Sequence, residues 1–396
     1  MNTDASAPQP NLPEEPERPP SAADVRREFL RLALLAAVAV AVFFGTRTVA
    51  ESTRRTRTAD AHAWFTEGQQ ALAGGHRDDA IARMRQAVVL DPERADYRLA
   101  LAESLSAAHR DADARGVLSA LRERDPEDPD VNLQLARISA RAGEVDEAGR
   151  YYQHALSALW SERDADRRRA VRFELIDYLL AQGRNGRALS ELLVLNADAP
   201  TGVPDQIRMG RLLLAAGDPR RAADRFDAVL KLEPEEPEAV AGAGLAAFAL
   251  GDYPRTLRLL NRASDSVAGV ADARAIARFV LDRDPLAARL GRLERTRRVR
   301  TTAAEMLAEA TMCLDRLPPA SQAASVLSVR IDALTSIVEP DPRLHRSATL
   351  DRDEVEEGLA QLVETVRTLQ AARCGPPTTL DRAVELMAAR HALDAA

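Results

Sequence analysis

A fixed interval of 34 residues recurs in the first two thirds of the chain and constrains its fold more than any other feature. The interval separates Pro92 from Pro126, and it also separates Pro200 from Pro234. The same interval spaces three glycines, which are Gly183, Gly217 and Gly251. A period of this length is typical of two short helices that stack on copies of themselves. The pattern therefore predicts an all-α solenoid over residues 61–263.

The first repeat, residues 61–94, contains two helical patterns separated by Gly74 and Gly75. Each pattern places apolar or small residues at i, i+4 and i+7, so that one face of each helix can pack. These residues are Trp64, Gly68 and Ala71 in the first pattern and Ala80, Met84 and Ala87 in the second. Glycine accepts the left-handed turn between the helices. Two helices this short cannot bury their apolar faces alone, so adjacent repeats must stack.

The order of these residues resembles the tetratricopeptide repeat family. Its repeat has a large residue early in the first helix, a small residue four positions later, alanines in the second helix and a final proline. Six such repeats begin near residues 61, 95, 129, 169, 203 and 237. The third lacks the proline and precedes a charged stretch at residues 161–168, and Thr256 replaces an alanine in the sixth. The resemblance implies a solenoid of about six helix–turn–helix repeats that binds proteins.

The N-terminal region predicts a tail, a membrane span and a connector. Residues 1–25 are rich in proline and poor in bulky apolar side chains, so we expect a disordered tail. Residues 29–46 are predicted to form one transmembrane helix, because residues 32–46 carry no charge. A cleaved signal peptide ending at Ala50 and a buried helix are the alternatives. The polar linker, residues 47–60, either continues the membrane helix or forms a tether.

The orientation of the span is not decided by its flanking charges. Arginines lie on both sides of it, so the positive-inside rule gives no answer. By analogy with other single N-terminal anchors, we expect a single pass through the inner (cytoplasmic) membrane of a bacterium, with the repeats in the periplasm. The alternative is a cytoplasm-facing adaptor that regulates an envelope-synthesis enzyme.

After residue 263 the period fails, and residues 270–396 predict a helical C-terminal domain that covers the open end of the solenoid. Its amphipathic stripes are separated by breaks at Pro318-Pro319 and Gly375-Pro376. The two cysteines, Cys313 and Cys374, form a disulfide if this domain is periplasmic and are otherwise two partly buried thiols. Six arginines between residues 289 and 300 form either a lipid- or partner-binding patch or a solvated helix face paired with acids.

In this family the first helix of each repeat lines a concave groove, so the resemblance implies that this surface binds a polypeptide. Here the outward positions combine apolar residues with charges of both signs, which suits an apolar peptide with charged flanks. The predicted groove residues are His62, Phe65, Gln69, Leu99, Glu103, Leu133, Arg137, Phe173, Asp177, Ile207, Arg211 and Leu245. The alternative is that several of them only pack between repeats. The lysines and asparagine of the family's clamp for peptide carboxylates are absent.

No residue cluster indicates catalysis. The six histidines are scattered without metal-ligand spacing, and no phosphate-binding, dinucleotide-binding or nucleophile-elbow motif occurs. A net charge of −7 with interspersed arginines argues against nucleic-acid binding. We therefore expect no enzyme, cofactor, metal or small-molecule substrate. The sequence predicts a membrane-anchored scaffold for assembly of an envelope complex, with an enzyme site in the C-terminal helices or a self-assembling structural protein as alternatives.

Overall fold

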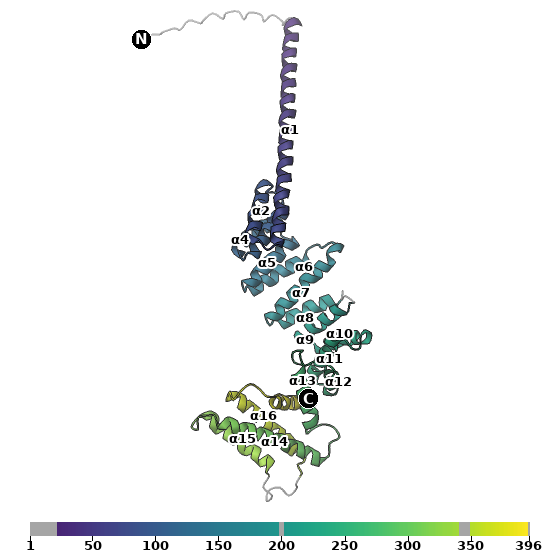
Figure 1. Cartoon of the computed structure of the whole chain (residues 1–396), viewed down its shortest axis with the longest axis vertical. Helices are drawn as coiled ribbons and strands as arrows, with labels where there is room; N and C mark the ends of the chain where they lie inside the picture. Colours follow the sequence, from purple (N-terminus) through teal and green to yellow (C-terminus); the bar gives the residue numbers. More distant parts are fainter. Residues whose placement is uncertain (1–21, 198–201, 340–348, 395–396) are drawn as a thin grey trace, which may run out of the picture. The chain divides into compact units, whose positions relative to one another are not determined.

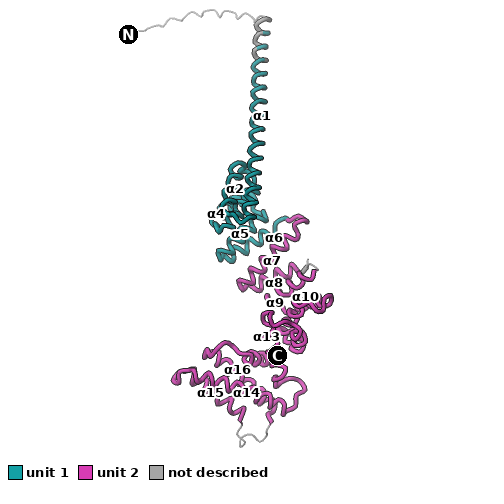
Figure 2. The backbone as a smooth tube through the Cα atoms, viewed as in Figure 1, with its two compact units in different colours: residues 1–159 teal, residues 160–396 magenta. Residues whose placement is uncertain are grey.

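The computed structural model describes residues 22–197, 202–339 and 349–394, and its regular elements over these ranges are helices without a strand. The chain forms two compact units, residues 1–159 and 160–396, which Figure 2 shows in different colours. The helices of the first unit are α1 (Ala22–Ala73), α2 (Arg77–Leu90), α3 (Ala95–Ala107), α4 (Asp111–Arg124), α5 (Pro129–Arg141) and α6 (Val145–Ser157). The second unit contains a 3₁₀ turn, Glu162–Asp164, and then α7 (Ala165–Ala181), α8 (Asn185–Ala197), α9 (Val203–Ala215), α10 (Pro219–Leu232), α11 (Pro237–Ala249), α12 (Tyr253–Leu260), α13 (Val270–Arg283), α14 (Arg292–Leu314), α15 (Gln322–Val338), α16 (Arg352–Ala371) and α17 (Thr379–Asp394).

The first unit is built on α1, a helix of 52 residues that runs without a break into the first repeat. In Figure 1 its N-terminal part stands clear of α2–α6. The stretch beginning at Leu34 is long and apolar enough to cross a membrane on length and composition alone, and none of its apolar window is buried. Of the two forms expected for residues 47–60, the structure shows the continuous helix.

The hydroxyl groups of this polar stretch are hydrogen-bonded within the helix. Thr48 donates to the carbonyl of Gly45 at 2.9 Å, and Thr53 donates to that of Val49 at the same distance. Such bonds to carbonyls three or four residues earlier satisfy the side chains within the helix itself. The predicted tail falls on residues 1–21, which lie outside the described residues, whereas residues 22–25 form the first turn of α1 rather than a disordered segment.

Small residues set the spacing of paired helices in both units. A Cβ atom added to Gly68 would lie 2.9 Å from Cε of Met84, so α1 and α2 pack closely. In the second unit, a Cβ atom on Gly244 would lie 2.2 Å from Cδ2 of Leu260. Thr256 stands where the repeat usually has alanine. Its buried hydroxyl group has a hydrogen-bond partner there, because it donates to the carbonyl of Asp252 at 2.8 Å.

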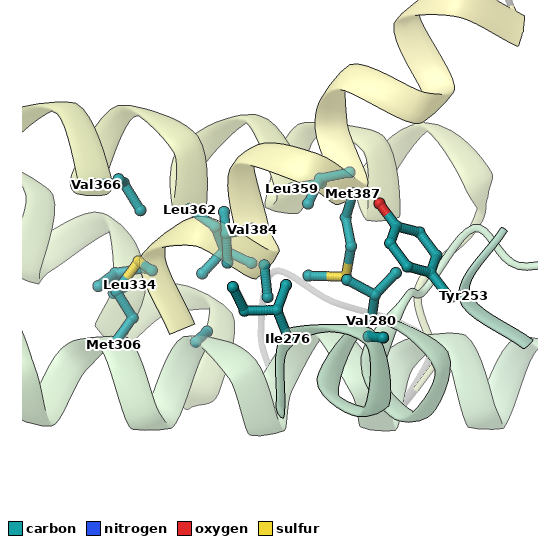
Figure 3. Packing of buried hydrophobic residues seen from close by; sticks show 13 residues of the cluster. Tyr253, Ile276, Val280, Met306, Leu334, Leu359, Leu362, Val366, Val384 and Met387 are labelled. Atoms are coloured by element: carbon teal, nitrogen blue, oxygen red, sulfur yellow. The ribbon is translucent and has the colours of Figure 1, made fainter. Parts of the chain in front are cut away.

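The last repeat and the C-terminal helices share one core. Tyr253 of α12 is buried together with Ile276 and Val280 of α13 and Met387 of α17 (Figure 3). Met306, Leu334 and Leu362 of α14, α15 and α16 extend the same cluster. The helices after residue 263 therefore cover the apolar end of the sixth repeat.

The two compact units divide the chain at residues 159 and 160, whereas the sequence places the domain boundary between residues 263 and 270. The shared core around Tyr253 explains why the C-terminal helices belong with the last three repeats. Each solenoid repeat contacts only its neighbours, so a weak connection can fall between any two of them. Here it falls where the third repeat lacks its proline and the charged stretch begins.

The two cysteines are joined. A disulfide links Cys313, at the end of α14, to Cys374, which follows α16, and their Cα atoms are 5.6 Å apart. Of the two states considered from the sequence, the paired one is present and the pair of partly buried thiols is not.

Candidate protein-binding surface

We call the solvent-facing side chains of α1, α3 and α5 in the first unit and of α7, α9 and α11 in the second the first-helix surface. In the first unit, His62 and Gln69 are exposed on α1, and Phe65 lies half-buried between them. The Phe65 ring packs on the ring of Tyr97 with centroids 4.7 Å apart. Phe65 thus joins the core on one side and remains partly exposed.

On α3 and α5, the predicted groove residues are held between repeats. Leu99, Glu103 and Arg137 are half-buried, and Leu133 is only 4% exposed. Glu103 accepts a hydrogen bond from Nε2 of Gln134 at 3.0 Å, which joins the first helices of two successive repeats. The polar groups of this surface therefore already have partners within the protein.

The second unit repeats this arrangement. Asp177 of α7 accepts from the guanidinium of Arg208 on α9 at 3.0 Å. Arg211 of α9 donates to Glu238 of α11 at 3.1 Å. All four side chains are at least 42% exposed, so water competes with each pair. A polypeptide that brings its own charges can therefore exchange with these pairs at small cost.

Three predicted groove residues belong to the core instead. Leu133, Phe173 and Ile207 are 4%, 3% and 7% exposed, and the guanidinium of Arg208 covers the Phe173 ring at 4.0 Å. The sequence could not separate these positions from exposed ones, because one helix face both packs on the next repeat and borders the surface. Leu245 is half-buried beside Ala241 in a small cluster around Leu260.

Gln134, Arg208 and Glu238 were not predicted as members of this surface. The pairs Glu103–Gln134 and Asp177–Arg208 both span 31 residues, in two different pairs of repeats. A search for complementary side chains 31 residues apart would have found Gln134 and Arg208, whereas Glu238 lies 27 residues from its partner Arg211.

Ion pairs elsewhere on the repeats are structural. Arg141 donates to both carboxylate oxygens of Asp111, at 2.7 and 3.0 Å, and this hydrogen bonding lowers the pKa of Asp111. The backbone N–H of Arg221 lowers the pKa of Asp218 at the start of α10. Because the pKa values of both carboxylates are lowered in the folded state, the two groups stabilise the fold at neutral pH. This contribution is lost as the pH falls through the folded-state pKa values.

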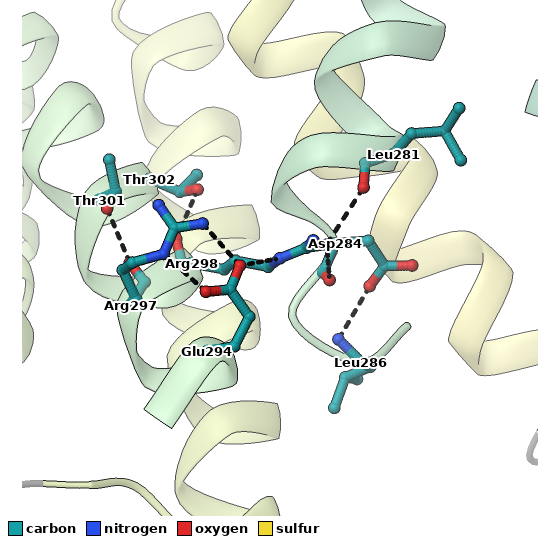
Figure 4. A network of polar contacts seen from close by, with 8 residues as sticks. All are labelled: Leu281, Asp284, Leu286, Glu294, Arg297, Arg298, Thr301 and Thr302. Atoms are coloured by element: carbon teal, nitrogen blue, oxygen red, sulfur yellow. Dashed lines mark hydrogen bonds and ion pairs between the residues drawn. The ribbon is translucent and has the colours of Figure 1, made fainter. Parts of the chain in front are cut away.

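The arginine-rich stretch is partly paired within the protein (Figure 4). Arg297 and Arg298 both donate to Glu294, and these bonds lower the pKa of Glu294 to about 2. Arg298 also donates to the backbone carbonyls of Leu281 and Asp284, at 3.1 and 3.0 Å. For these two arginines the structure shows a helix face paired with an acid rather than a free basic patch.

The C-terminal helices contain a buried acid with a histidine partner. Asp284 is 1% exposed, and its Oδ1 lies 2.9 Å from Nε2 of His391. Over the ranges that the structure describes, no group of three or more histidine, cysteine, aspartate or glutamate side chains is arranged to hold a metal ion.

Comparisons with known proteins identify the repeats. Residues 71–138 and residues 207–269 match two models of the tetratricopeptide repeat. The chain is similar to the solved structure of Pseudomonas aeruginosa PilF, with 16% identity, 54% of this chain and 95% of that chain covered, and a TM-score of 0.40. It is also similar to YrrB, described as a tetratricopeptide repeat protein with an unusual peptide-binding site, at 18% identity, with 48% and 95% covered and a TM-score of 0.39.

A third similar structure is PilW, described as a type IV pilus biogenesis factor, at 17% identity, with 51% and 91% covered and a TM-score of 0.38. A comparison with curated proteins finds no match. The family assignment rests on the two repeat matches and on the helix pairs that they cover. The chain contains tetratricopeptide repeats over residues 71–138 and 207–269.

Proposed function

We propose that this protein is a membrane-anchored scaffold that binds a polypeptide partner on its first-helix surface during assembly of an envelope complex, with the repeats in the periplasm. The observation that carries the proposal is α1, one helix that contains both an exposed apolar stretch and the first helix of a repeat. An anchor that continues into the repeat keeps the binding surface near the membrane and raises its effective concentration for membrane-bound partners.

The disulfide supports the periplasmic side. Disulfides persist in oxidising compartments and are rare in the reducing cytoplasm. The bond between Cys313 and Cys374 joins α14 to the segment after α16 within the second unit. A protein whose C-terminal helices are crosslinked in this way suits the periplasm better than the cytoplasm-facing alternative.

Alkaline phosphatase fused after Ala396 is expected to be active, because this enzyme requires export to the periplasm for its own disulfides. β-Galactosidase fused at the same position is expected to be inactive. The matched control is the fusion to residues 58–396, which lacks the apolar part of α1 and should reverse both signals. Activity of the β-galactosidase fusion alone would place the repeats in the cytoplasm and contradict the proposal.

The first-helix surface is tested by changing one exposed ion pair. Asp177→Asn removes the partner of Arg208, and we expect less than about 1 kcal/mol loss of stability because such pairs are hydrated. We also expect a clear decrease in the partner recovered by crosslinking of intact membranes. Measuring urea unfolding beside crosslinking yield separates binding from folding.

Asp227→Asn is the matched control, because Asp227 pairs with Arg255 of the next repeat at 2.6 Å but lies on a second helix, α10. This variant should leave the crosslinking yield unchanged. Equal losses in the two variants would mean that the first-helix surface has no special role.

A further inference from the structure

A cavity of about 310 Å³ lies in the C-terminal part of the second unit, between the end of α14 and the beginning of α17. Met312, Pro376 and Pro377 supply apolar parts of its wall, and the disulfide between Cys313 and Cys374 forms another part. The disulfide ties the segment before α17 to α14. One side of the cavity is therefore fixed by covalent and proline-restricted backbone, and longer side chains such as Glu309, Met312 and Arg316 complete its walls.

One wall of this cavity carries a buried carboxylate with an unused oxygen. Asp381 is 4% exposed, and its Oδ2 accepts the backbone N–H of Thr378 at 2.9 Å. Its own backbone N–H donates to Oγ1 of Thr378 at 3.1 Å, which completes the cap of α17. Oδ1 of Asp381 is buried and has no hydrogen-bond partner. An unsatisfied buried carboxylate oxygen costs free energy that a bound donor would offset.

A second carboxylate lines the same cavity. Glu309 of α14 is half-buried, and burial together with the charge of Asp381 raises its pKa. Two acids that face one cavity repel each other, and a positive charge between them removes this repulsion. Arg316 also lines the cavity but is exposed, and no ion pair among the described residues joins it to either acid.

We infer that this cavity binds the cationic end of an arginine or lysine side chain from a polypeptide partner. The inference rests on the proposed function in that the partner is a polypeptide. The cavity is about ten times the volume of one water molecule, which suits a guanidinium or ammonium group with its methylene stem. The stem would pack on Met312 and the two prolines, while the charged end lies beside the carboxylates of Asp381 and Glu309.

The size and walls of the cavity favour this occupant over a metal ion. Only two acids line the cavity, and among the described residues no group of three or more histidine, cysteine, aspartate or glutamate side chains is arranged to hold a metal ion. Two carboxylates beside the apolar wall of this cavity are instead complementary to a long side chain with a positively charged end.

The test is calorimetric titration of the full-length protein in nonionic detergent with Nα-acetyl-arginine amide, Nα-acetyl-lysine amide and the neutral isostere Nα-acetyl-citrulline amide. We expect one or both cationic probes to bind and the citrulline probe to bind at least about tenfold more weakly. The ratio of the arginine and lysine affinities identifies the preferred side chain. Equal binding of the citrulline probe would overturn the inference, as would calcium chloride that binds tightly and displaces the arginine probe.

Glu309→Gln and Asp381→Asn are each expected to lower the affinity for the cationic probe by about tenfold or more. The Asp381→Asn variant keeps a side-chain oxygen that accepts the N–H of Thr378, so it tests binding in a protein that retains this cap bond. Glu309 lies on α14, and its carboxylate is hydrogen-bonded to the side chain of Thr378, so urea unfolding of the Glu309→Gln variant is measured beside its binding. Arg316→Gln is the matched control and should bind the probe at least as well, because it removes a competing cation. Unchanged affinity in both acid variants would overturn the inference.

These outcomes are separate from those of the proposed function. If the protein crosslinks normally to its partner but binds neither cationic probe, the cavity is rejected as a binding site and the proposal for the first-helix surface stands. If Asp381→Asn weakens probe binding but Asp177→Asn leaves the crosslinking yield unchanged, the first-helix surface is rejected and the proposal for the cavity stands.

Discussion

Replacing Gly242 with alanine is expected to destabilise the second unit by about 1–3 kcal/mol. The sign is opposite to the usual effect, because alanine is normally better than glycine inside a helix by close to 1 kcal/mol. Gly242 lies in α11, and a Cβ atom added there would be 2.3 Å from Cζ of Phe226. Phe226 is fully buried, so its ring cannot turn away into solvent.

The Phe226 ring is confined from two sides. A Cβ atom on Gly210 of α9 would lie 2.7 Å from the same ring atom. Phe226 belongs to α10, the second helix of the fifth repeat, and it packs against the first helices of its own repeat and of the next one. Relief of the clash at Gly242 would therefore push the ring toward Gly210. This confinement is why a single methyl group is expected to have a large effect.

Gly116→Ala is the matched control for this prediction. Gly116 lies inside α4, is exposed, and a Cβ atom added to it would meet nothing within 4 Å. The substitution should stabilise the first unit by roughly 0.5–1 kcal/mol. Hydrogen exchange measured by mass spectrometry on the full-length protein reports each unit separately through its own peptides.

Faster exchange in α9–α11 of Gly242→Ala and slower exchange in α4 of Gly116→Ala are the expected results. A further Phe226→Leu substitution should recover part of the loss at Gly242, because the smaller side chain leaves room for the methyl group. If Gly242→Ala protects α11 instead, the ring does not occupy the space between the two glycines.

Features that depend on spacing along the chain could be predicted from the sequence. The 34-residue interval predicts the helix pairs, and the turn glycines Gly183, Gly217 and Gly251 all adopt the positive φ expected after a helix. The close approach of the paired helices at Gly68 and Gly244 follows because each glycine faces a large residue of the second helix in its repeat, Met84 and Leu260 respectively. The helices after residue 263 follow from apolar stripes and proline breaks, and all of them occur.

Features that depend on which face of a helix meets which neighbour could not be predicted in this way. Phe173 and Phe65 hold comparable positions in their repeats, yet Phe173 is buried under the guanidinium of Arg208, whereas Phe65 is only half-buried. The division into two units depends on a core that Tyr253 shares with helices far along the chain. The unpaired oxygen of Asp381 depends on the local cap of α17 and on the wall of the cavity, and neither feature produces a regular spacing in the sequence.

Replacing both Cys313 and Cys374 with alanine is expected to cost the largest stability change, about 4 kcal/mol. The bond closes a loop with a sequence separation of 61 residues, and in the chain-entropy account a loop of this length restricts the unfolded state strongly. Alanine is the suitable replacement, because Cys313 is buried among Ala310, Leu327 and Leu369 and a polar substitute would add a second cost.

The measurement is hydrogen exchange and urea unfolding of the full-length protein in detergent, with and without a phosphine reductant. The oxidised wild-type protein should be the most stable, and reduction should bring it to the level of the double variant. The double variant itself should not respond to the reductant, which controls for effects on any other group. Because the lost entropy belongs to the unfolded chain, the α14 and α16 peptides should exchange faster even though the remaining contacts of these helices are unchanged. Equal stability of the oxidised protein and the double variant would show that the bond does not restrain this unit.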